Sequence, residues 1–311
     1  MKGISIVLTF YNGSRFIKEQ IQTLFLQTRQ FDELLIFDDC SLLSERTKLQ
    51  SIVDEFCDER ISIFSNEQNL GYSANFIEGI KKAKYETVFL CDQDDLWDVT
   101  KIQIMSDIIE NKAGISLLCS DIQPFYSSNK APKWDKKNLK TMKCDGSLEM
   151  IDMSFTNFHL QRSGCSMCFR KSFFDQISDF WIDDWGHDDF LWKYAVLHKQ
   201  CAIIHLPLIQ RRIHENNTSE LKIRTKDSRI DNIKKQNNQY INLLNNNNLT
   251  KNDIDIIQKM VEANKKRINF LTGKNVFSWF AIFAKYKYAY PRKAGVYLDL
   301  YLFLFKKYKT K

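Results

Sequence analysis

The chain has 311 residues, of which 44% are hydrophobic and 27% charged, a composition that excludes a disordered chain, a collagen-like repeat and a small disulfide-bonded scaffold. The scarcity of glycine (10 residues) and proline (4 residues) argues against long flexible linkers. The formal net charge of +7 equals that of residues 285–311, which carry eight basic side chains and one acid, so residues 1–284 are neutral as a whole.

The first 120 residues alternate between strands and helices. Short runs of apolar and β-branched residues predict strands at residues 4–10, 34–37, 61–64, 87–90 and 115–119. Apolar residues at helical spacing predict helices at residues 14–25, 45–57, 75–83 and 100–109. Strands that alternate with helices through short polar connections indicate βαβ units. The sequence therefore predicts an α/β fold with a mostly parallel sheet flanked by helices.

Residues 121–160 interrupt this alternation. They form a polar, lysine-rich stretch with a weak helix at residues 148–153. Further elements are predicted as a strand at residues 164–170, a helix at 188–198 and a strand at 201–205. We therefore expect residues 1–220 to form one α/β domain.

A different composition begins after Asn217. The chain there is rich in Asn, Lys and Ile and has no strand pattern. Thr250, three residues before Asp253, can cap a helix that ends near Gly273. Residues 221–311 are therefore expected to form a helical C-terminal extension.

Polar segments follow the first four predicted strands. They are residues 9–13, 38–41, 66–72 and 92–95. Ligands of open α/β sheets bind beyond the carboxyl ends of the strands. We therefore expect a binding site at one rim of the sheet.

The most informative of these segments is Asp92-Gln93-Asp94-Asp95, which directly follows an apolar strand. Alternate carboxylates can share a hard divalent cation through oxygen ligands, and Mg²⁺ or Mn²⁺ so held completes its shell with water and diphosphate oxygens. The alternative is a solvated acidic turn in which Asp98 caps the next helix.

Asp38 and Asp39, at the end of another strand, favour a nucleotide ligand, because an acid there can accept hydrogen bonds from a nucleobase or a ribose hydroxyl. Residues 9–13 stand where dinucleotide-binding enzymes have a glycine-rich loop, and the P-loop pattern is also missing from the sequence. Two other functions stay open: a nucleotidyl- or phosphoryl-transferring enzyme that uses the same carboxylates, and a protein that binds a nucleotide sugar without turnover.

Seven motifs, in order and spacing, resemble those of family-2 glycosyltransferases. They are TFYNG (9–13), FDDCS (37–41), NLGYSANF (69–76), LCDQDDLW (90–97), SGCSMCFRKSFF (163–174), GHDDFLW (186–192) and RRIHENNTS (211–219). They look closest to the bacterial rhamnosyltransferase-like branch. The resemblance covers about residues 1–220 and implies a GT-A fold, with a nucleotide-sugar-binding half at residues 1–120 and an acceptor half at residues 121–220.

The resemblance also implies roles for individual residues in donor binding. The expected nucleotide-sugar contacts are Thr9, Phe10, Tyr11, Asn12, Asp39, Asn69, Gly71, Asn75, Asp92, Gln93, Asp94, Asp95, Arg212 and His214. Among these, Thr9, Tyr11 and Asp39 would hold the base and ribose. A Mg²⁺ or Mn²⁺ cofactor is expected, and its expected ligands are Asp92, Asp94 and His214.

The second-half motifs are expected to bind the acceptor and supply a catalytic base. The expected acceptor contacts are Gly164, Cys165, Trp185 and His187. Asp188 matches the base of the family. His187 stands before it where the common family form has Glu, and Asp189 follows it, so Asp189 stays open as the alternative base.

The implied reaction is an inverting sugar transfer in cell-surface polysaccharide synthesis. The donor would be a nucleoside-diphosphate sugar, a UDP- or dTDP-sugar with rhamnose as one candidate, and the acceptor a hydroxyl of a glycan or of a lipid-linked sugar. A carboxylate that takes the proton of the acceptor hydroxyl suits this chemistry.

Residues 276–311 interleave aromatic and basic residues. This composition is compatible with a membrane surface, with a packed pair of helices, or with nucleic acid. We favour the membrane surface and expect no nucleic-acid partner.

The remaining signals concern the compartment. The first residues lack the longer apolar stretch and the small-residue cleavage site typical of a signal peptide, so none is expected. No run approaches about 18 apolar residues, so no transmembrane helix is expected either. Most of the eight cysteines lie in apolar runs, as buried reduced thiols do, and Cys165 and Cys168 form one CxxC without the second pair of a zinc site. We therefore expect a cytoplasmic protein, peripheral on the inner face of the cell membrane.

Overall fold

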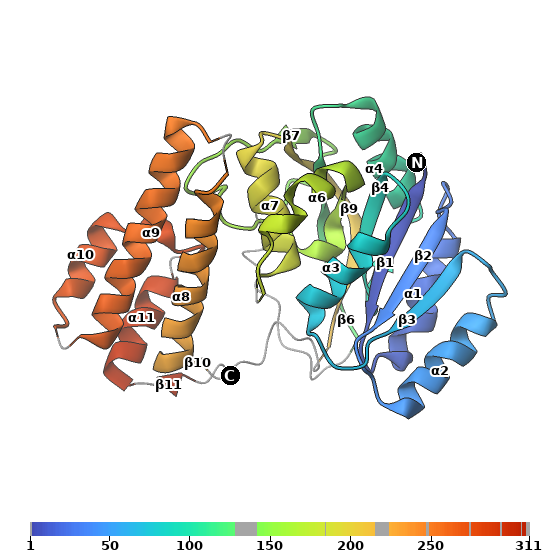
Figure 1. The fold of residues 1–311 in the computed structure, drawn as a ribbon, viewed down its shortest axis with the longest axis horizontal. Coiled ribbons are helices and arrows are strands. Elements are labelled where there is room, and N and C mark those ends of the chain that lie inside the picture. Colours follow the sequence, from blue (N-terminus) through green and yellow to red (C-terminus); the bar gives the residue numbers. More distant parts are fainter. Residues whose placement is uncertain are drawn as a thin grey trace. The chain divides into compact units, whose positions relative to one another are not determined.

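The computed structural model describes residues 2–127, 142–183, 185–214, 224–246, 249–273, 275–292, 294–305 and 307–308 (Figure 1). The chain forms two compact units. The first, here called the sheet unit, comprises Met1–Ile151 and Gln161–Glu215. The second, here called the helical unit, comprises Asp152–Leu160 and Asn216–Lys311.

One mixed sheet runs through the sheet unit. Within the described residues its strand order is β3-β2-β1-β4-β8-β6-β9-β5, with β7 also paired to β9. The strands are β1 (Ile4–Phe10), β2 (Glu33–Asp38), β3 (Ile61–Ser65), β4 (Thr87–Asp92), β5 (Leu96–Trp97), β6 (Leu117–Tyr126), β7 (Leu148–Met150), β8 (Met167–Arg170) and β9 (Cys201–Ile213). Strands β3, β2, β1 and β4 are parallel, whereas β8 is antiparallel to β4 and β6. The α/β architecture predicted from the sequence is confirmed.

Helices pack on both faces of this sheet (Figure 1). They are α1 (Ser14–Phe25), α2 (Leu43–Asp54), α3 (Tyr72–Lys82), α4 (Lys101–Asn111), α6 (Lys171–Ile177) and α7 (His187–Leu197), with short 3₁₀ turns η1 (Gly164–Ser166) and η2 (Ser178–Phe180). Leu8 of β1 shares a core with Ile21 of α1 and Met105 of α4. Val7 points to the other face, where a Cβ atom on Gly79 of α3 would lie 2.4 Å from its Cγ1. Alternation along β1 thus gives each helix layer its own apolar contacts.

The structure corrects two sequence predictions in the second half of the sheet unit. Residues 148–153, predicted as a weak helix, contain strand β7, because Leu148–Met150 pairs with residues 202–204 of β9. Strand β9 continues to Ile213 instead of ending at residue 205, since it pairs with β6 along most of its length. Both elements depend on pairing with a distant strand, which local periodicity does not report.

Helices dominate the helical unit. Its elements are β10 (Arg224–Thr225), α8 (Lys226–Leu243), α9 (Lys251–Thr272), α10 (Ser278–Lys285), η3 (Lys287–Ala289), α11 (Ala294–Phe305) and β11 (Lys307–Tyr308). The predicted cap is confirmed: Thr250 Oγ1 accepts from Asp253 N (3.2 Å), and Asp253 Oδ2 accepts from Thr250 N (2.9 Å). The antiparallel pair of β10 and β11 is a third correction, because no strand was predicted after Asn217. None of the described helices combines the length and the apolar character needed to cross a bilayer.

A buried carboxylate joins three parts of the helical unit. Asp299 of α11 is fully buried and accepts hydrogen bonds from Arg229 Nε of α8 (2.7 Å) and Arg267 Nε of α9 (3.0 Å). The Tyr290 hydroxyl donates to the same carboxylate (2.6 Å). Asp299 therefore fixes α11 against α8 and α9.

Replacing Asp299 should destabilise the helical unit strongly. In Asp299→Ala two guanidinium groups lose their shared counter-charge, and breaking a buried ion pair in this way costs about 3–5 kcal/mol. The measurement is hydrogen exchange of peptides from α8, α9 and α11 across a urea series. The matched control is Asp255→Ala, whose exposed pair with Lys259 (2.7 Å) should contribute less than about 1 kcal/mol. Equal protection of the two variants would contradict the role of Asp299.

Candidate active site

The ends of β1, β2 and β4 bring the predicted donor segments together at one rim of the sheet. Strand register places Thr9 beside Phe37 of β2 and Asp92 of β4. Tyr11 N donates to Gln93 Oε1 (2.9 Å), and Gln93 Nε2 donates to Tyr11 O (3.2 Å). These reciprocal bonds fix the segment after β1 to the segment after β4.

The turn after β1 needs unusual backbone conformations. Asn12 has a positive φ of 49°, and its side chain accepts a hydrogen bond from Leu42 N (2.9 Å). A Cβ atom on Gly13 would lie 2.1 Å from Gln93 Oε1, so glycine permits the contact between the two segments. Tyr11 is half exposed and presents its ring to the rim, whereas the Phe10 side chain is buried in the core and leaves only its backbone there.

Asp39 orders the loop before α3. Its carboxylate is buried and accepts from Leu70 N (2.7 Å), Gly71 N (2.9 Å) and Asn66 Nδ2 (3.0 Å). Asn69 Nδ2 donates to Asp39 O (3.0 Å). Gly71, with φ 81°, takes a conformation that favours glycine, so the loop shape is set by backbone as well as by charge.

Asn75 supports the same loop from the first turn of α3. Its side chain is buried, donates to Phe37 O (2.8 Å) and accepts from Asn66 Nδ2 (2.9 Å). It therefore acts on a ligand through the loop rather than by a direct contact in this conformation.

The three aspartates at the end of β4 have different environments. Asp94 Oδ2 lies 2.7 Å from His214 Nε2. Asp95 is buried, and its Oδ1 accepts from Arg212 N (3.0 Å), whereas its Oδ2 has no hydrogen-bond partner among the described residues. Ligand atoms of Asp92, Asp95 and Cys165 all lie within 4.8 Å of one another.

Burial and mutual repulsion destabilise the charged forms of these carboxylates. Burial, and then the charge of Asp94, raise the pKa of Asp92 to about 6. Burial, and then the charges of Asp94 and Asp92, raise the pKa of Asp95 well above its usual value. The cluster therefore favours a nearby cation.

Three basic side chains surround the carboxylates. Lys101 is fully buried, and its Nζ donates to Cys165 O (2.7 Å) and lies 3.9 Å from the centre of the Trp97 ring. Arg211 interacts electrostatically with all three aspartates. Arg212 Nε donates to Asp94 O (2.8 Å).

Arg212 also contacts side chains of other elements. Its guanidinium pairs with Glu19 (2.6 Å) and lies over the rings of Phe16 and Phe125. In this conformation Arg212 holds the end of β9 against the aspartate segment.

The two candidate bases at the start of α7 differ in their partners. Asp189 pairs with Lys193, and its Oδ2 accepts from Trp185 Nε1 (2.9 Å). Asp188 Oδ1 accepts from Asp189 N (2.8 Å), and its charge acts on Asp92. Both oxygens of Asp189 are thus bonded to Trp185 and Lys193, whereas the charge of Asp188 acts on Asp92 of the carboxylate cluster. Trp185 is fully buried and offers no surface to an acceptor in this conformation.

His187 lies between α3 and the turn η1. Its ring centre is 4.2 Å from that of Phe76, and a Cβ atom on Gly164 would lie 2.5 Å from its Nε2. Both ring nitrogens are buried and have no hydrogen-bond partner among the described residues, and burial lowers the pKa of His187. Gly164 and Cys165 are themselves buried, so the turn η1 packs against the imidazole of His187, the residue before Asp188.

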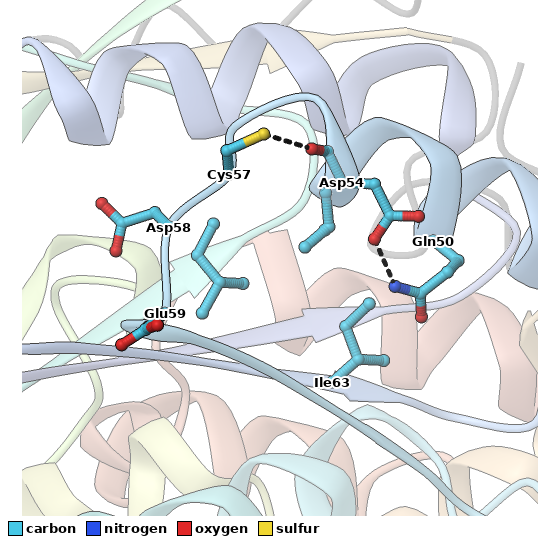
Figure 2. Close-up of a pocket in the computed structure, with 8 residues that line it drawn as sticks. Gln50, Asp54, Cys57, Asp58, Glu59 and Ile63 are labelled. Atoms are coloured by element: carbon cyan, nitrogen blue, oxygen red, sulfur yellow. Dashed lines mark hydrogen bonds between the residues drawn. The ribbon is translucent and has the colours of Figure 1, made fainter.

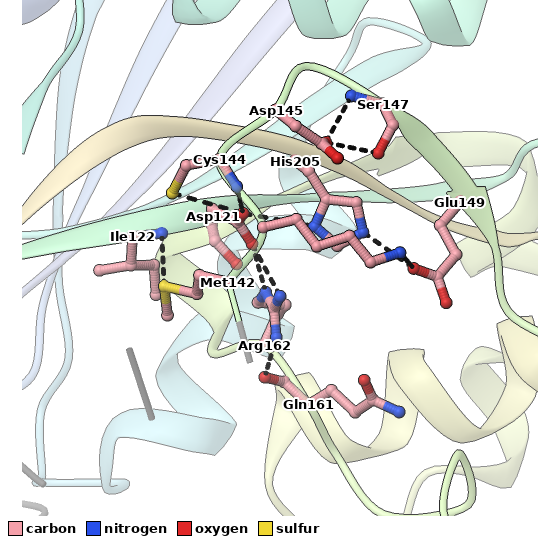
Figure 3. Close-up of polar contacts among 12 residues, drawn as sticks. Asp121, Ile122, Met142, Cys144, Asp145, Ser147, Glu149, Gln161, Arg162 and His205 are labelled. Atoms are coloured by element: carbon pink, nitrogen blue, oxygen red, sulfur yellow. Dashed lines mark hydrogen bonds and ion pairs between the residues drawn. The ribbon is translucent and has the colours of Figure 1, made fainter. Parts of the chain in front are cut away.

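A buried ion pair precedes that turn (Figure 3). The Arg162 guanidinium donates to Asp121 Oδ1 through Nε (3.1 Å) and a terminal nitrogen (2.7 Å), and both side chains are buried. Asp121 Oδ2 accepts from Cys144 N (3.2 Å) and lies 3.3 Å from His205 Nδ1. Asp121 thus links β6 and β9 to the segment that leads into Gly164.

A surface hollow of about 420 Å³ lies elsewhere in the sheet unit (Figure 2). It is lined by residues from the end of α2 to β3: Gln50, Val53, Asp54, Cys57, Asp58, Glu59, Ile61 and Ile63. Ile61 is the first residue of β3, so the hollow is at the amino end of a parallel strand, whereas the candidate site is at the carboxyl ends.

The donor set fits a divalent cation. Aspartate oxygens and one imidazole suit Mg²⁺ or Mn²⁺, and the unpartnered Asp95 Oδ2 is a buried acceptor available beside them. The structure thus brings the predicted ligands Asp94 and His214 into contact and places Asp92 beside Asp95 and Cys165.

Sequence reasoning missed Lys101, Asp121 and Arg162. Lys101 lies at the start of a helix, where a lysine ordinarily faces water, and no sequence signal indicates its burial. Arg162 directly precedes the motif at residues 163–174, and this position was the one available hint.

Comparison with known families assigns the chain to a family. The sequence profile described as Glycosyl transferase family 2 matches residues 5–175, more than half of the chain. The chain belongs to glycosyl transferase family 2. The chain has the GT-A fold that the motifs had suggested.

Curated relatives of this chain are distant. TuaG of Bacillus subtilis (strain 168), whose name assigns it to teichuronic acid biosynthesis, is 26% identical over 136 residues, covering 42% of this chain and 53% of TuaG. RT0329 of Rickettsia typhi, an uncharacterized glycosyltransferase, is 25% identical over 227 residues (70% of this chain and 65% of RT0329). WfgD of Escherichia coli, named as a UDP-Glc:alpha-D-GlcNAc-diphosphoundecaprenol beta-1,3-glucosyltransferase, is 31% identical over 101 residues (32% of this chain and 38% of WfgD). The match thus spans between about a third and two thirds of these relatives.

Solved structures share the fold. Residues 1–349 of S. aureus TarS in complex with UDP-GlcNAc give a TM-score of 0.66 at 15% identity, covering 98% of this chain and 88% of that chain. The mannosyltransferase PcManGT from Pyrobaculum calidifontis, in complex with GDP-Man and Mn²⁺, gives 0.60 at 12% identity, covering 97% and 85%.

The carboxylate cluster should lower the stability of the metal-free protein above pH 6. Asp92 has a pKa of about 6 when folded, against 3.8 ordinarily, so its destabilising effect is absent below about pH 4 and complete above about pH 6. Asp92→Asn in EDTA should therefore raise the free energy of unfolding by about 3 kcal/mol at pH 8 and leave it nearly unchanged at pH 4. Urea titrations at both pH values measure this. Glu59→Gln, an exposed change of equal charge, is the control, and a gain of the same size in it would contradict the assignment.

Proposed function

We propose that this glycosyltransferase moves a sugar, with inversion at the anomeric carbon, from a nucleoside-diphosphate sugar to a hydroxyl of a glycan or lipid-linked acceptor in cell-surface polysaccharide synthesis. The observation that carries the proposal is the group of carboxylates at the end of β4, where Asp92 lies beside Asp95 and Asp94 contacts His214. The charge of Asp188 also acts on Asp92. Together these contacts support a diphosphate site and a base that act on one bound sugar. Family membership favours sugar transfer over the nucleotidyl- or phosphoryl-transfer alternative.

The donor would bind along the rim from β2 to β4. Tyr11, half exposed, would contact the base, with Thr9 beside it and the Asp39-ordered loop closing around the base and ribose. UDP and dTDP are the nucleotides to test first, since TarS is solved with UDP-GlcNAc and WfgD is named for UDP-Glc. Rhamnose is one of the sugars to test, because the motifs resemble those of the rhamnosyltransferase-like branch.

Asp92, Asp94 and His214 would hold the Mg²⁺ or Mn²⁺ ion. When bound, the ion supplies positive charge that neutralises the departing diphosphate. PcManGT, a structural neighbour, is solved with Mn²⁺, which supports the choice of ions to test. Arg211, which acts on the same aspartates, would add positive charge at the diphosphate.

Asp188 would take the proton of the acceptor hydroxyl. Asp188 is in the first turn of α7, where negative charge is favoured, and its carboxylate accepts from Asp189 N. Asp189 is held by Lys193 and Trp185, so it would position the helix rather than move a proton. Attack from the side opposite the diphosphate in a single displacement inverts the anomeric carbon.

The enzyme would act at the cytoplasmic face of the cell membrane, as a peripheral protein. A lipid-linked acceptor requires access to a bilayer, and WfgD is named for a diphosphoundecaprenol acceptor. The net charge of +7 in residues 285–311 supports attraction to anionic lipid.

Asp188→Asn should abolish transfer and leave donor binding intact. Removing a general base lowers the rate by about 10²–10⁴. Turnover is measured as release of nucleoside diphosphate, and donor binding by calorimetry. Asp189→Asn is the matched control: it should lower the melting temperature by weakening the contact with Lys193 and retain more turnover than Asp188→Asn. Wild-type turnover in Asp188→Asn would contradict the assignment of the base.

Turnover should require a divalent ion. With UDP- and dTDP-sugars as a donor panel, EDTA should abolish release of nucleoside diphosphate and Mn²⁺ or Mg²⁺ should restore it, because the aspartates otherwise repel the diphosphate. Asp94→Asn should not recover at any metal concentration. Full turnover in EDTA would contradict the metal role, and donor binding without turnover of any sugar would favour a non-catalytic binding protein.

A further inference from the structure

The helical unit has an exposed aromatic surface that contains none of the residues of the candidate active site. Its members are the large apolar side chains on and next to α10 and α11 that are between 40% and 73% exposed: Phe277, Phe280, Phe283, Tyr297, Tyr301, Leu304 and Phe305. We call these seven residues the aromatic face. Single exposed hydrophobic residues are ordinary, whereas a contiguous patch marks a site of interaction.

The members of the aromatic face are contiguous. The ring centre of Trp279 lies 5.2 Å from that of Phe283 and 5.9 Å from that of Tyr297, which joins α10 to α11. Tyr297, Tyr301 and Phe305 recur every four residues and therefore lie on one side of α11. The rings of Tyr301 and Phe305 are 4.8 Å apart. The face is one surface rather than scattered side chains.

Buried contacts keep this face turned outward. Val296, Asp299 and Leu302 are the buried residues of α11, and Asp299 is bonded to α8 and α9. Trp279 Nε1 donates to Val296 O (3.1 Å), which ties α10 to the same helix. A helix on the surface of a soluble protein ordinarily presents polar residues to water, but α11 has apolar residues on both sides.

The surrounding charge selects the partner. Lys285, Lys287 and Arg292 are exposed and stand between the members of the face on α10 and those on α11 in the sequence, within the segment that carries a net charge of +7. A second copy would bring an equal positive charge against the first, so self-association is opposed. Aromatic rings beside lysine and arginine suit the headgroup region of an anionic bilayer.

We infer that the aromatic face binds the surface of an anionic lipid bilayer, with its rings among the headgroups and its basic residues at the lipid phosphates. This deepens the proposed function by naming the surface that contacts the membrane. The inference rests on the proposed function in one respect: the function explains why the protein would bind a membrane, namely to reach a lipid-linked acceptor.

The test is sedimentation of the full chain with vesicles of phosphatidylglycerol and phosphatidylcholine. Phe280→Ser/Phe305→Ser should lower the partition coefficient by about tenfold or more, because each ring loses its burial in lipid. The matched control is Leu26→Ser/Leu43→Ser, which removes two equally exposed apolar side chains from the sheet unit and should bind as wild type. Vesicles of phosphatidylcholine alone should bind the wild type more weakly than the anionic mixture.

Three results would overturn the inference. They are absence of wild-type sedimentation with anionic vesicles, equal binding of the two double variants, and a wild-type dimer that the phenylalanine variant converts to a monomer without any change in vesicle binding. Donor turnover on the same preparations separates this inference from the proposed function. If the wild type binds anionic vesicles but turns over no donor, the proposed function alone is contradicted. If the wild type turns over donor but does not bind vesicles, the membrane inference alone is contradicted.

Discussion

Mutual repulsion among Asp92, Asp94 and Asp95 is the constraint on which the rest of the site depends. Asp92 ends the buried strand β4 and the other two carboxylates follow it directly, so folding of the core brings them together at the rim. Burial raises the pKa of Asp92 and Asp95, and a free-energy penalty follows whenever they are ionised without a cation. Arg211 and the buried Lys101 offset part of that penalty. A bound divalent ion, together with its diphosphate ligand, would relieve the remaining penalty.

The neighbouring loops are built around the same aspartates, and their side chains are mostly used to hold one another. Gln93 joins the turn after β1 to the aspartate segment, and Asp39 binds the backbone amides of the loop before α3. At the start of α7, the two oxygens of Asp189 bind Lys193 and Trp185. Asp188 is the neighbouring carboxylate whose charge acts on Asp92. Preorganised groups of this kind need little rearrangement when a substrate binds.

Most of the sheet and its rim could be predicted from the sequence, because parallel βαβ units show local periodicity and place their polar ends together. Strand β7 and the second half of β9 could not, since their pairing joins residues far apart in the chain. For the site, the motifs indicated the aspartates and His214, but not that Arg212 would be engaged by Glu19 or that Trp185 would be buried. Lys101 and Asp121 escaped prediction because their importance comes from burial.

The central claim is that the aspartates after β4 bind a nucleoside diphosphate through a divalent ion. Calorimetric titration of UDP and dTDP into wild type and Asp94→Asn, with and without Mn²⁺, tests it most directly. For at least one nucleotide, the wild-type affinity should rise by about tenfold or more with Mn²⁺, since the ion offsets the repulsion between the carboxylates and the diphosphate. Asp94→Asn should lose that gain. Wild-type affinity that is the same with and without Mn²⁺ for every nucleotide would contradict the claim.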